Sequence, residues 1–266
     1  MQDKYGRKIS YLRVSVTDRC NLRCRYCMPE EGVKLLSHDD ILSLEEIRDI
    51  VRTAVEMGIT KVRLTGGEPL VRKGITDLVA MLASIKGITD LALTTNGILL
   101  SDYAGKLARA GLNRVNVSID TMDPWRFRKI TRGGDIEKVK KGIKAAQNAG
   151  LSPIKLNCVI GKFSTDADAE SVKVFGAENG FQVRTIRLMD FAAGKFSVVE
   201  GGSGGDCPHC TRLRLTSDGR IRPCLFSDKT YSIRTLGPKE AIQQAVKNKP
   251  EFGGPCDHNW MHGIGG

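Results

Sequence analysis

The sequence predicts an α/β fold: a partial (β/α)6 barrel of the TIM type followed by a C-terminal extension. Short β-branched and apolar runs alternate with segments of helical period over residues 1–190, which is the pattern of a parallel sheet covered by helices. The 266 residues are 41% hydrophobic, enough for a sizeable buried core. A glycine-rich stretch then separates this region from a second group of cysteines, which defines the extension.

Six short runs, most of them followed by a turn and a helical pattern, are expected to be the strands. The strands of such a barrel are parallel, so their carboxyl ends meet at one face, where active sites gather. The runs are "YLRVSV" (11–16), "KVRLTGG" (61–67), "LALTTNG" (91–97), "RVNVSID" (114–120), "IKLNCVI" (154–160) and "VRTIRLMD" (183–190).

The clearest expected helix covers residues 43–58. Ser43 and Glu46 form a capping box, apolar residues recur on one face, and Gly58 ends the helix. Similar patterns predict helices in residues 76–87, 102–111, 135–150 and 168–180.

The sequence also predicts the compartment. No apolar run approaches the roughly 18 to 20 residues of a membrane span, and the first ten residues lack the apolar stretch of a secretory signal. We therefore expect a cytoplasmic protein with no membrane partner. Cysteines stay reduced in that compartment, so clusters of them are better interpreted as metal ligands or catalytic thiols than as disulfides.

Three of the eight cysteines lie close together, directly after the first predicted strand. Cys20, Cys24 and Cys27 have the spacing C-x3-C-x2-C. Three thiolates on a cubic [4Fe-4S] cluster leave one iron without a protein ligand, and this iron is free to bind another molecule. A structural zinc site is the alternative, but it usually takes four ligands and the sequence offers no fourth one nearby.

The composition changes after residue 190. Residues 191–206 have no clear period and contain Gly-Gly-Ser-Gly-Gly, which predicts a shortened flexible linker. Residues 207–266 form a third region, which carries a second triad, Cys207, Cys210 and Cys224, and ends in a Gly-Gly tail. We therefore expect three regions: the barrel, the linker and a C-terminal region with its own cysteine site.

The first cysteine loop, with Tyr26 before its last cysteine, resembles the radical S-adenosylmethionine superfamily. The resemblance implies that the open iron of a first [4Fe-4S] cluster chelates S-adenosylmethionine, and that an electron from the cluster cleaves the sulfonium to a 5'-deoxyadenosyl radical. Three residues at strand ends match further cofactor-binding positions: Gly67 in "TGGEP", Thr94 in "LTTNG" and Ser118 in "NVSID". Taken alone, these residue types are also typical of turns.

The likeness extends into the second triad, which carries "TRLRLTSDG" between its members, and to the terminal "IGG". Over nearly its whole length the chain resembles the GTP 3',8-cyclases of molybdenum cofactor biosynthesis. This implies a second [4Fe-4S] cluster on Cys207, Cys210 and Cys224, whose open iron binds the guanine of GTP, and it implies that Met189 packs near the adenine of S-adenosylmethionine. The residues implied to bind GTP are Arg13, Lys61, Arg63, Lys155, Arg184, Arg212 and Arg214.

The same basic residues make sense without the resemblance. The formal net charge of +11 indicates an anionic partner, and Lys and Arg bind phosphates through charge-assisted hydrogen bonds. Arg13, Arg63 and Arg184 alternate with apolar residues inside predicted strands, an unfavourable place for a cation without an anion nearby. For each residue alone, a solvated surface charge is the alternative.

Two other functions fit parts of the sequence. A radical enzyme that modifies a peptide would also have an auxiliary cluster, but such enzymes usually have more cysteines behind the barrel. An RNA-binding protein would explain the charge, with structural cysteines, but the sequence lacks an aromatic stacking platform. We therefore expect a lyase that uses GTP, S-adenosylmethionine and an electron donor, with no nucleic acid as partner.

The linker is the main departure from the family pattern. The family normally has a much longer segment before the second triad, so residues 191–206 indicate either a laboratory deletion or a naturally compact relative. The family resemblance further implies that the tail, Gly265 and Gly266, reaches the active site, and it leaves a homodimer open. Cys158 and Cys256 belong to neither triad, and we interpret both as inert packing residues.

Overall fold

A computed structural model of the chain describes residues 1–257 and residue 261. The tail residues Gly265 and Gly266, expected at the active site, lie outside the described residues. The strands are β1 (Tyr11–Ser15), β2 (Lys61–Thr65), β3 (Asp90–Thr95), β4 (Arg114–Ser118), β5 (Lys155–Ile160), β6 (Gln182–Arg187), β7 (Arg212–Leu215), β8 (Arg220–Arg222) and β9 (Tyr231–Ser232).

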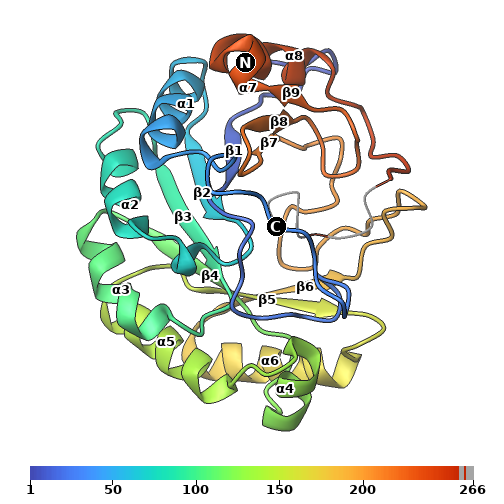
Figure 1. Cartoon of the computed structure of the whole chain (residues 1–266). Coiled ribbons are helices and arrows are strands. Elements are labelled where there is room, and N and C mark those ends of the chain that lie inside the picture. Colours follow the sequence, from blue (N-terminus) through green and yellow to red (C-terminus); the bar gives the residue numbers. More distant parts are fainter. Residues whose placement is uncertain (258–260, 262–266) are drawn as a thin grey trace.

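The first six strands confirm the predicted (β/α)6 order. Each pairs in parallel with the next along the chain, from β1 to β6. The sheet curves, and its helices cover the outer side (Figure 1). The carboxyl ends of all six strands therefore lie at one end of a partial barrel, as the sequence predicted.

The helices include all five that the sequence predicted. The capping box of Ser43 and Glu46 is present at the first of them, where it satisfies backbone N–H groups at the helix start. The 3-10 turn η1 and three of the helices, α4, α7 and α8, had not been predicted. The helices are α1 (Leu44–Glu56), α2 (Ile75–Ala83), α3 (Leu100–Arg109), α4 (Pro124–Thr131), α5 (Ile136–Asn148), α6 (Asp166–Asn179), α7 (Ile233–Leu236) and α8 (Pro238–Lys247), and η1 covers Pro69–Val71.

The C-terminal region joins the same sheet. Strand β7 pairs in parallel with β1, on the side opposite β2, and β8 and β9 continue the sheet in antiparallel order. Arg13 of β1 therefore lies between Arg63 of β2 and Arg214 of β7 in the strand register. This pairing brings residues from both ends of the chain to one surface of the sheet.

The segment of residues 191–206 connects β6 to β7. Thr185 of β6 exchanges two backbone hydrogen bonds of 3.1 Å with Glu200, and Arg212 of β7 donates to the carbonyl and hydroxyl of Ser203 over 3.1 and 2.6 Å. Gly201 has a positive φ, and a side chain there would meet the Val183 carbonyl at 2.5 Å. The segment, expected to be flexible, thus bridges the two edges of the parallel sheet through specific contacts, and at Gly201 glycine is required by backbone geometry.

The hydrophobic core lies between the sheet and the outer helices. Ile47, Leu78 and Leu107, from α1, α2 and α3, are fully buried against strand residues such as Leu64 and Val117. No helix in the described part of the chain is long and apolar enough to cross a membrane.

Candidate active site

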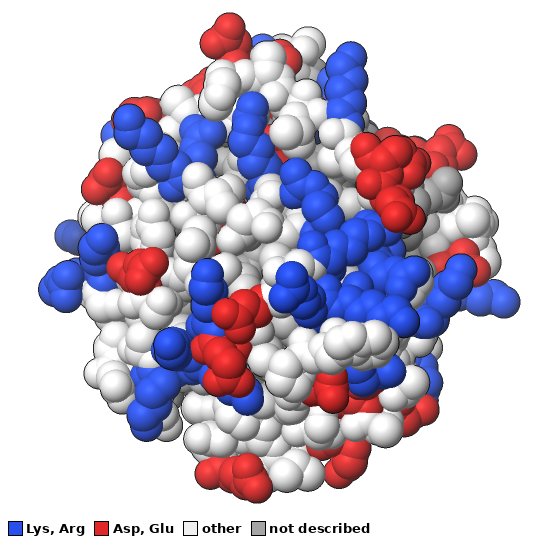
Figure 2. Space-filling model, turned by 60° about the horizontal axis from the view of Figure 1, so that its bottom comes forward, with Lys and Arg blue, Asp and Glu red and all other residues white. Residues whose placement is uncertain are grey.

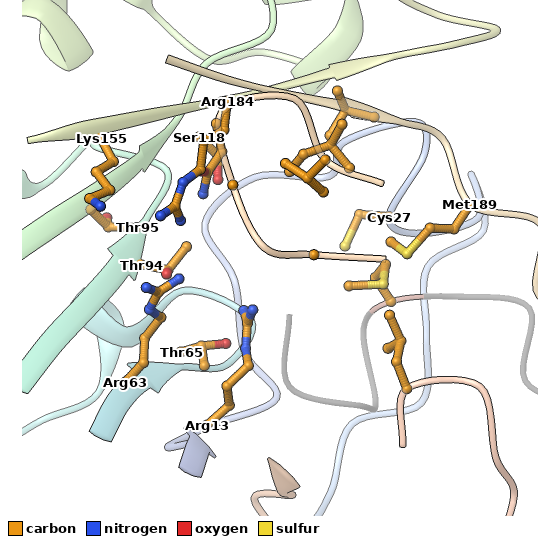
Figure 3. Close-up of a pocket in the computed structure, with 18 of the residues that line it drawn as sticks. Arg13, Cys27, Arg63, Thr65, Thr94, Thr95, Ser118, Lys155, Arg184 and Met189 are labelled. Atoms are coloured by element: carbon orange, nitrogen blue, oxygen red, sulfur yellow. The ribbon is translucent and has the colours of Figure 1, made fainter. Parts of the chain in front are cut away.

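A cavity of about 650 Å³ lies on the concave side of the sheet, between the strands and the first cysteine loop. All seven residues expected to bind GTP line it, together with all five expected to bind S-adenosylmethionine. Figure 3 shows Arg13, Arg63, Lys155 and Arg184 on one side of this space and Cys27 and Met189 on the other. The structure therefore brings together residues that are up to about 200 positions apart in sequence.

The cavity is strongly basic. Nine Lys and Arg side chains line it, against two carboxylates, Glu68 and Asp90. Asp90 is already paired with Arg114, which contacts its two oxygens at 2.9 and 2.6 Å. Basic side chains also gather on one outer face of the molecule, where acidic ones are more scattered (Figure 2). The cavity therefore focuses a positive field that favours a polyanion.

Three of the arginines have no partner for part of their guanidinium. The Nε atoms of Arg13, Arg63 and Arg184 are buried and make no hydrogen bond. Burial lowers the pKa of Arg13 well below its usual value, and the neighbouring Arg214 lowers it further. The pKa of Arg214 falls to about 10, mainly through burial and then through Arg212. Burial of these cations and the repulsion between them are both unfavourable in the free protein. An anionic ligand would offset the burial and reduce the repulsion.

Tyr11 is a cavity residue that the sequence reasoning missed. Its ring lies 5.4 Å from the guanidinium of Arg63 and 5.7 Å from that of Arg212, within range of a cation–π interaction. Its hydroxyl is buried and has no partner. Tyr11 precedes Arg13 by two positions, so the period of the strand could have indicated that both face the same side.

The first cysteine loop enters the cavity from the end of β1. Cys20, Cys24 and Cys27 all line the cavity and form no disulfide. Burial raises the pKa of all three thiols, that of Cys27 to about 12. A bound metal takes cysteine as the thiolate, so it would have to displace the protons of these thiols against this effect of burial.

Tyr26, expected at the cofactor, has a specific partner within the protein. Its hydroxyl donates to Asp120 over 2.9 Å, and the other oxygen of that carboxylate accepts the backbone N–H of Val159 over 2.9 Å. Burial raises the pKa of Asp120 to about 6. Asp120 thus joins the cysteine loop to the ends of β4 and β5.

Glu68 of the "TGGEP" motif, which follows β2, binds the carboxyl end of β3. Its carboxylate accepts hydrogen bonds from the hydroxyl of Thr95 at 2.8 Å and the backbone N–H of Asn96 at 2.7 Å. The side-chain amide of Asn96 in turn donates to Asn21 over 2.8 Å. Burial raises the pKa of Glu68 to about 7. The motif therefore connects β2, β3 and the cysteine loop.

The glycine at position 67 has a structural reason besides the expected approach to a cofactor. A Cβ there would lie 2.2 Å from the carbonyl oxygen of Arg19. The Gly67 N–H donates to Thr17 over 2.8 Å, and the Glu68 N–H donates to Arg19 over 2.8 Å. Two backbones meet here, and only glycine allows this approach.

Helix α4, absent from the sequence prediction, supports the cysteine loop from outside. The carbonyls of Thr131 and Ile130 accept the backbone N–H groups of Arg23 and Arg25 over 3.2 and 2.9 Å. Arg132, in the left-handed region with φ 54°, donates to the carbonyls of Arg23 and Met28 over 3.0 and 3.1 Å. Backbone and side-chain hydrogen bonds from the end of α4 therefore hold the course of the loop.

The other residues expected near the cofactor lie around the same space. Thr94 and Ser118 line the cavity from β3 and β4, and Met189 lines it beyond β6. The hydroxyl of Thr94 is buried without a hydrogen-bond partner. A ligand with polar groups at this position would satisfy it.

The second triad lies beside the cavity. Cys207, Cys210 and Cys224 are half-buried and form no disulfide, and their chain neighbours Thr211 and Leu225 line the cavity. A buried ion pair of Arg7 with Asp3, at 2.6 Å, holds one part of this region, because Arg7 also donates to the Cys207 carbonyl over 2.9 Å. The two cysteines outside the triads, Cys158 and Cys256, are buried.

Arg214 connects the two regions. It lines the cavity, and it lies on β7, in the segment between Cys210 and Cys224. Five other residues that line or support the cavity were not predicted from the sequence, and each of them is hydrogen-bonded to another part of the protein. They are Glu68, Asp90, Asn96, Arg114 and Asp120.

Comparison with known proteins gives one consistent result. Residues 14–175 match the Radical SAM superfamily. The chain is 43% identical to the GTP 3',8-cyclase of Peptoclostridium acidaminophilum, over 93% of this chain and 91% of the relative. It is 44% identical to that of Moorella thermoacetica, over 99% and 96%. With the enzyme of Pelotomaculum thermopropionicum the alignment covers both chains completely and spans 325 positions, at 39% identity, so relatives have residues that this 266-residue chain lacks.

Solved structures agree on the fold. Streptococcus suis SuiB bound to S-adenosylmethionine superposes with a TM-score of 0.68 at 15% identity, over 93% of this chain and 65% of SuiB. The enzyme anSMEcpe with bound AdoMet gives a TM-score of 0.63 at 16% identity, over 90% and 78% of the two chains.

Proposed function

The chain belongs to the radical S-adenosylmethionine superfamily and, within it, to the GTP 3',8-cyclases, and from this premise we propose how its residues carry out the reaction. GTP is converted to (8S)-3',8-cyclo-7,8-dihydroguanosine 5'-triphosphate, an early step in molybdenum cofactor biosynthesis. A peptide substrate is not favoured. SuiB, whose structure has been solved with a precursor peptide bound, is only 16% identical to this chain.

The observation that carries the assignment of roles is the basic cavity next to the first triad. Arg13, Arg63 and Arg184 each present a buried, unpartnered Nε, and we assign them to the triphosphate. Lys61, Lys155 and Arg212 line the same wall and extend the charge-assisted contacts to the nucleotide. Burial and Arg184 lower the pKa of Lys155 to about 8, so a bound phosphate would restore its charge.

The residues around the first triad fit a [4Fe-4S] cluster and S-adenosylmethionine. Three thiols line one end of the cavity, and the unsatisfied hydroxyl of Thr94 offers a polar contact. Among the described residues, no three His, Cys, Asp or Glu side chains converge on one point as they would around a single ion. A cube-shaped cluster places each thiolate on a different iron.

The second triad is proposed to hold a second [4Fe-4S] cluster, with Arg214 between it and the cavity. Its support is the three half-buried thiols, whose chain neighbours line the cavity, and Arg214, which lines the cavity from the segment between Cys210 and Cys224. When bound, the first cluster and S-adenosylmethionine supply a radical that removes the hydrogen of the ribose C3' of GTP. The protein residues bind the triphosphate, orient the guanine towards the second triad and exclude water.

Three further points belong to the proposal. An external electron donor is required, because the reductive cleavage of S-adenosylmethionine consumes an electron. The proposed location is the cytoplasm, because cysteines stay reduced in that compartment. A homodimer is consistent with the family and leaves the assignment of the cavity unchanged.

Iron analysis after anaerobic reconstitution tests the proposal. The chain should carry about eight irons, and a variant with alanine at Cys207, Cys210 and Cys224 should retain about four. Cys24→Ala should abolish formation of 5'-deoxyadenosine while the distal cluster remains. Zinc in place of iron, or cofactor cleavage by Cys24→Ala at the parent rate, would contradict the ligand assignment.

A further inference from the structure

Lys249 is a fully buried lysine directly after α8. Its exposed fraction is 1%, and a lysine is almost never buried to this extent without a partner. Its Nζ donates to the backbone carbonyls of Arg212 and Pro223 over 2.8 and 2.6 Å. None of the ion pairs found in the described part of the chain joins Lys249 to a carboxylate.

The two carbonyls belong to the second triad. Arg212 lies two residues after Cys210, and Pro223 directly precedes Cys224. One ammonium group therefore joins the backbones that carry two of the three cysteines. Carbonyl dipoles satisfy hydrogen bonds but carry no net charge, so the charge of Lys249 still requires an anion.

Cys210 is the group that can supply this anion. Its side chain interacts with the ammonium group of Lys249, and a cysteine that binds a metal does so as a thiolate.

Arg7 completes the arrangement from the other side. It donates to the carbonyl of Pro250, next to Lys249, over 2.6 Å and to that of Cys207 over 2.9 Å. Two cations, Arg7 and Lys249, thus join all three cysteine-bearing segments through backbone carbonyls. The segments are fixed relative to one another by the protein itself.

We propose that Lys249 is a positioning residue and a built-in countercharge of the second triad: its ammonium group fixes the backbone beside Cys210 and Cys224 and balances the negative charge of the thiolates and their cluster. This inference rests on the second cluster proposed above. A cation beside an iron–sulfur cluster favours its reduced, more negative state, so Lys249 raises the reduction potential.

Three substitutions separate the charge from the hydrogen bonds. Lys249→Arg keeps both, Lys249→Gln keeps donors but removes the charge, and Lys249→Met removes both. Lys247→Gln is the matched control, because Lys247 is exposed at the end of α8 and the change in net charge is the same. All are made in a chain with alanine at Cys20, Cys24 and Cys27, so that only the second triad binds iron.

The readouts are iron and sulfide per chain, the midpoint potential from an EPR-monitored titration, and the circular dichroism spectrum. Lys249→Arg and Lys247→Gln should match the parent, which takes up about four irons. Lys249→Gln should have a more negative midpoint potential, and Lys249→Met should retain less than half of the iron. If Lys249→Met does not fold, the potential of Lys249→Gln decides the question.

Two results would overturn the inference, and they are distinguishable. If Lys249→Gln and Lys249→Met keep the iron content and potential of the parent, Lys249 has no role at the triad although the second cluster exists. If the parent with only the second triad takes up no iron, the proposed second cluster is wrong and the inference falls with it.

Discussion

The hydroxyl of Tyr26 lies 2.9 Å from the carboxylate of Asp120, a hydrogen bond between the first cysteine loop and the end of β4. Both groups are on the inner side of the protein, and Asp120 is 2% exposed. The loop that is expected to hold the first cluster is therefore anchored to the barrel by a residue adjacent to one of its own cysteines.

Tyr26→Phe should lower the free energy of unfolding by about 1–3 kcal/mol, because it leaves a buried carboxylate oxygen without its donor. Urea unfolding of the single variants Tyr26→Phe and Asp120→Asn, and of the double variant, forms a cycle that isolates the interaction. Strictly additive effects would mean that the hydrogen bond does not contribute to stability.

Glu68 predicts a pH dependence of stability. Burial raises its pKa from 4.5 to about 7, so between these pH values the folded chain keeps a proton that the unfolded chain releases. The free energy of unfolding, taken relative to Glu68→Gln, should therefore fall as the pH rises from 4.5 to 7, by up to about 3 kcal/mol, and level off above. Urea unfolding of both proteins at several pH values, in the same cluster state, measures this, and a constant difference would contradict it.

Gly67→Ala should disrupt the first cysteine loop, because the new Cβ would lie 2.2 Å from the Arg19 carbonyl oxygen. We expect iron uptake by the first triad to fall by more than half while the second triad keeps its share. Gly105→Ala is the control: Gly105 lies within α3, where alanine meets nothing closer than 3.4 Å and should stabilise the helix by about 0.5–1 kcal/mol. Equal iron contents in the two variants would show that the close approach is dispensable.

Arg13→Met should separate stability from binding. Arg13 is a half-buried cation with a buried, unpartnered Nε, and it is flanked in register by Arg63 and Arg214, so its removal should leave the ligand-free protein at least as stable. Affinity for GTP should fall about ten- to hundredfold, since charge-assisted contacts contribute about 1.5–3 kcal/mol. Anaerobic calorimetry and thermal unfolding test the two halves.

The control for Arg13→Met is Lys86→Met, because Lys86 is exposed after α2 and does not line the cavity, so the affinity of this variant for GTP should match that of the parent. Destabilisation of the free protein by Arg13→Met would show that the arginine is needed for the fold instead of the ligand.

The strand order and the basic wall of the cavity could be predicted because they follow from local pattern. Arg13, Arg63 and Arg184 alternate with apolar residues in strands, and period two then fixes which face they share. The extended segment with Arg212 and Arg214 could be recognised on the same grounds, but its place beside β1 could not, since parallel pairing with a strand so distant in sequence leaves no local signal.

The supporting contacts could not be predicted for a related reason. Glu68 and Asp120 hold the cysteine loop through hydrogen bonds between strand ends, and Lys249 reaches carbonyls far from it in sequence. Helix α4 has only eight residues, too short to show a clear helical period. The polar partners of buried groups depend on the tertiary arrangement, which the sequence pattern alone does not specify.

The pairing of β7 with β1 has a consequence for the order of folding. Strands β1 to β6 each pair with the next strand along the chain, whereas Tyr11 of β1 pairs with Arg212 of β7, about 200 residues away. Loop closure over such a separation is slow compared with local pairing. During synthesis, the half of the protein with the first triad can therefore assemble while β1 still has an open edge. The second triad and the last wall of the cavity are completed only when the C-terminal region docks onto that edge, so premature pairing of the edge with another chain is the characteristic misfolding risk of this protein.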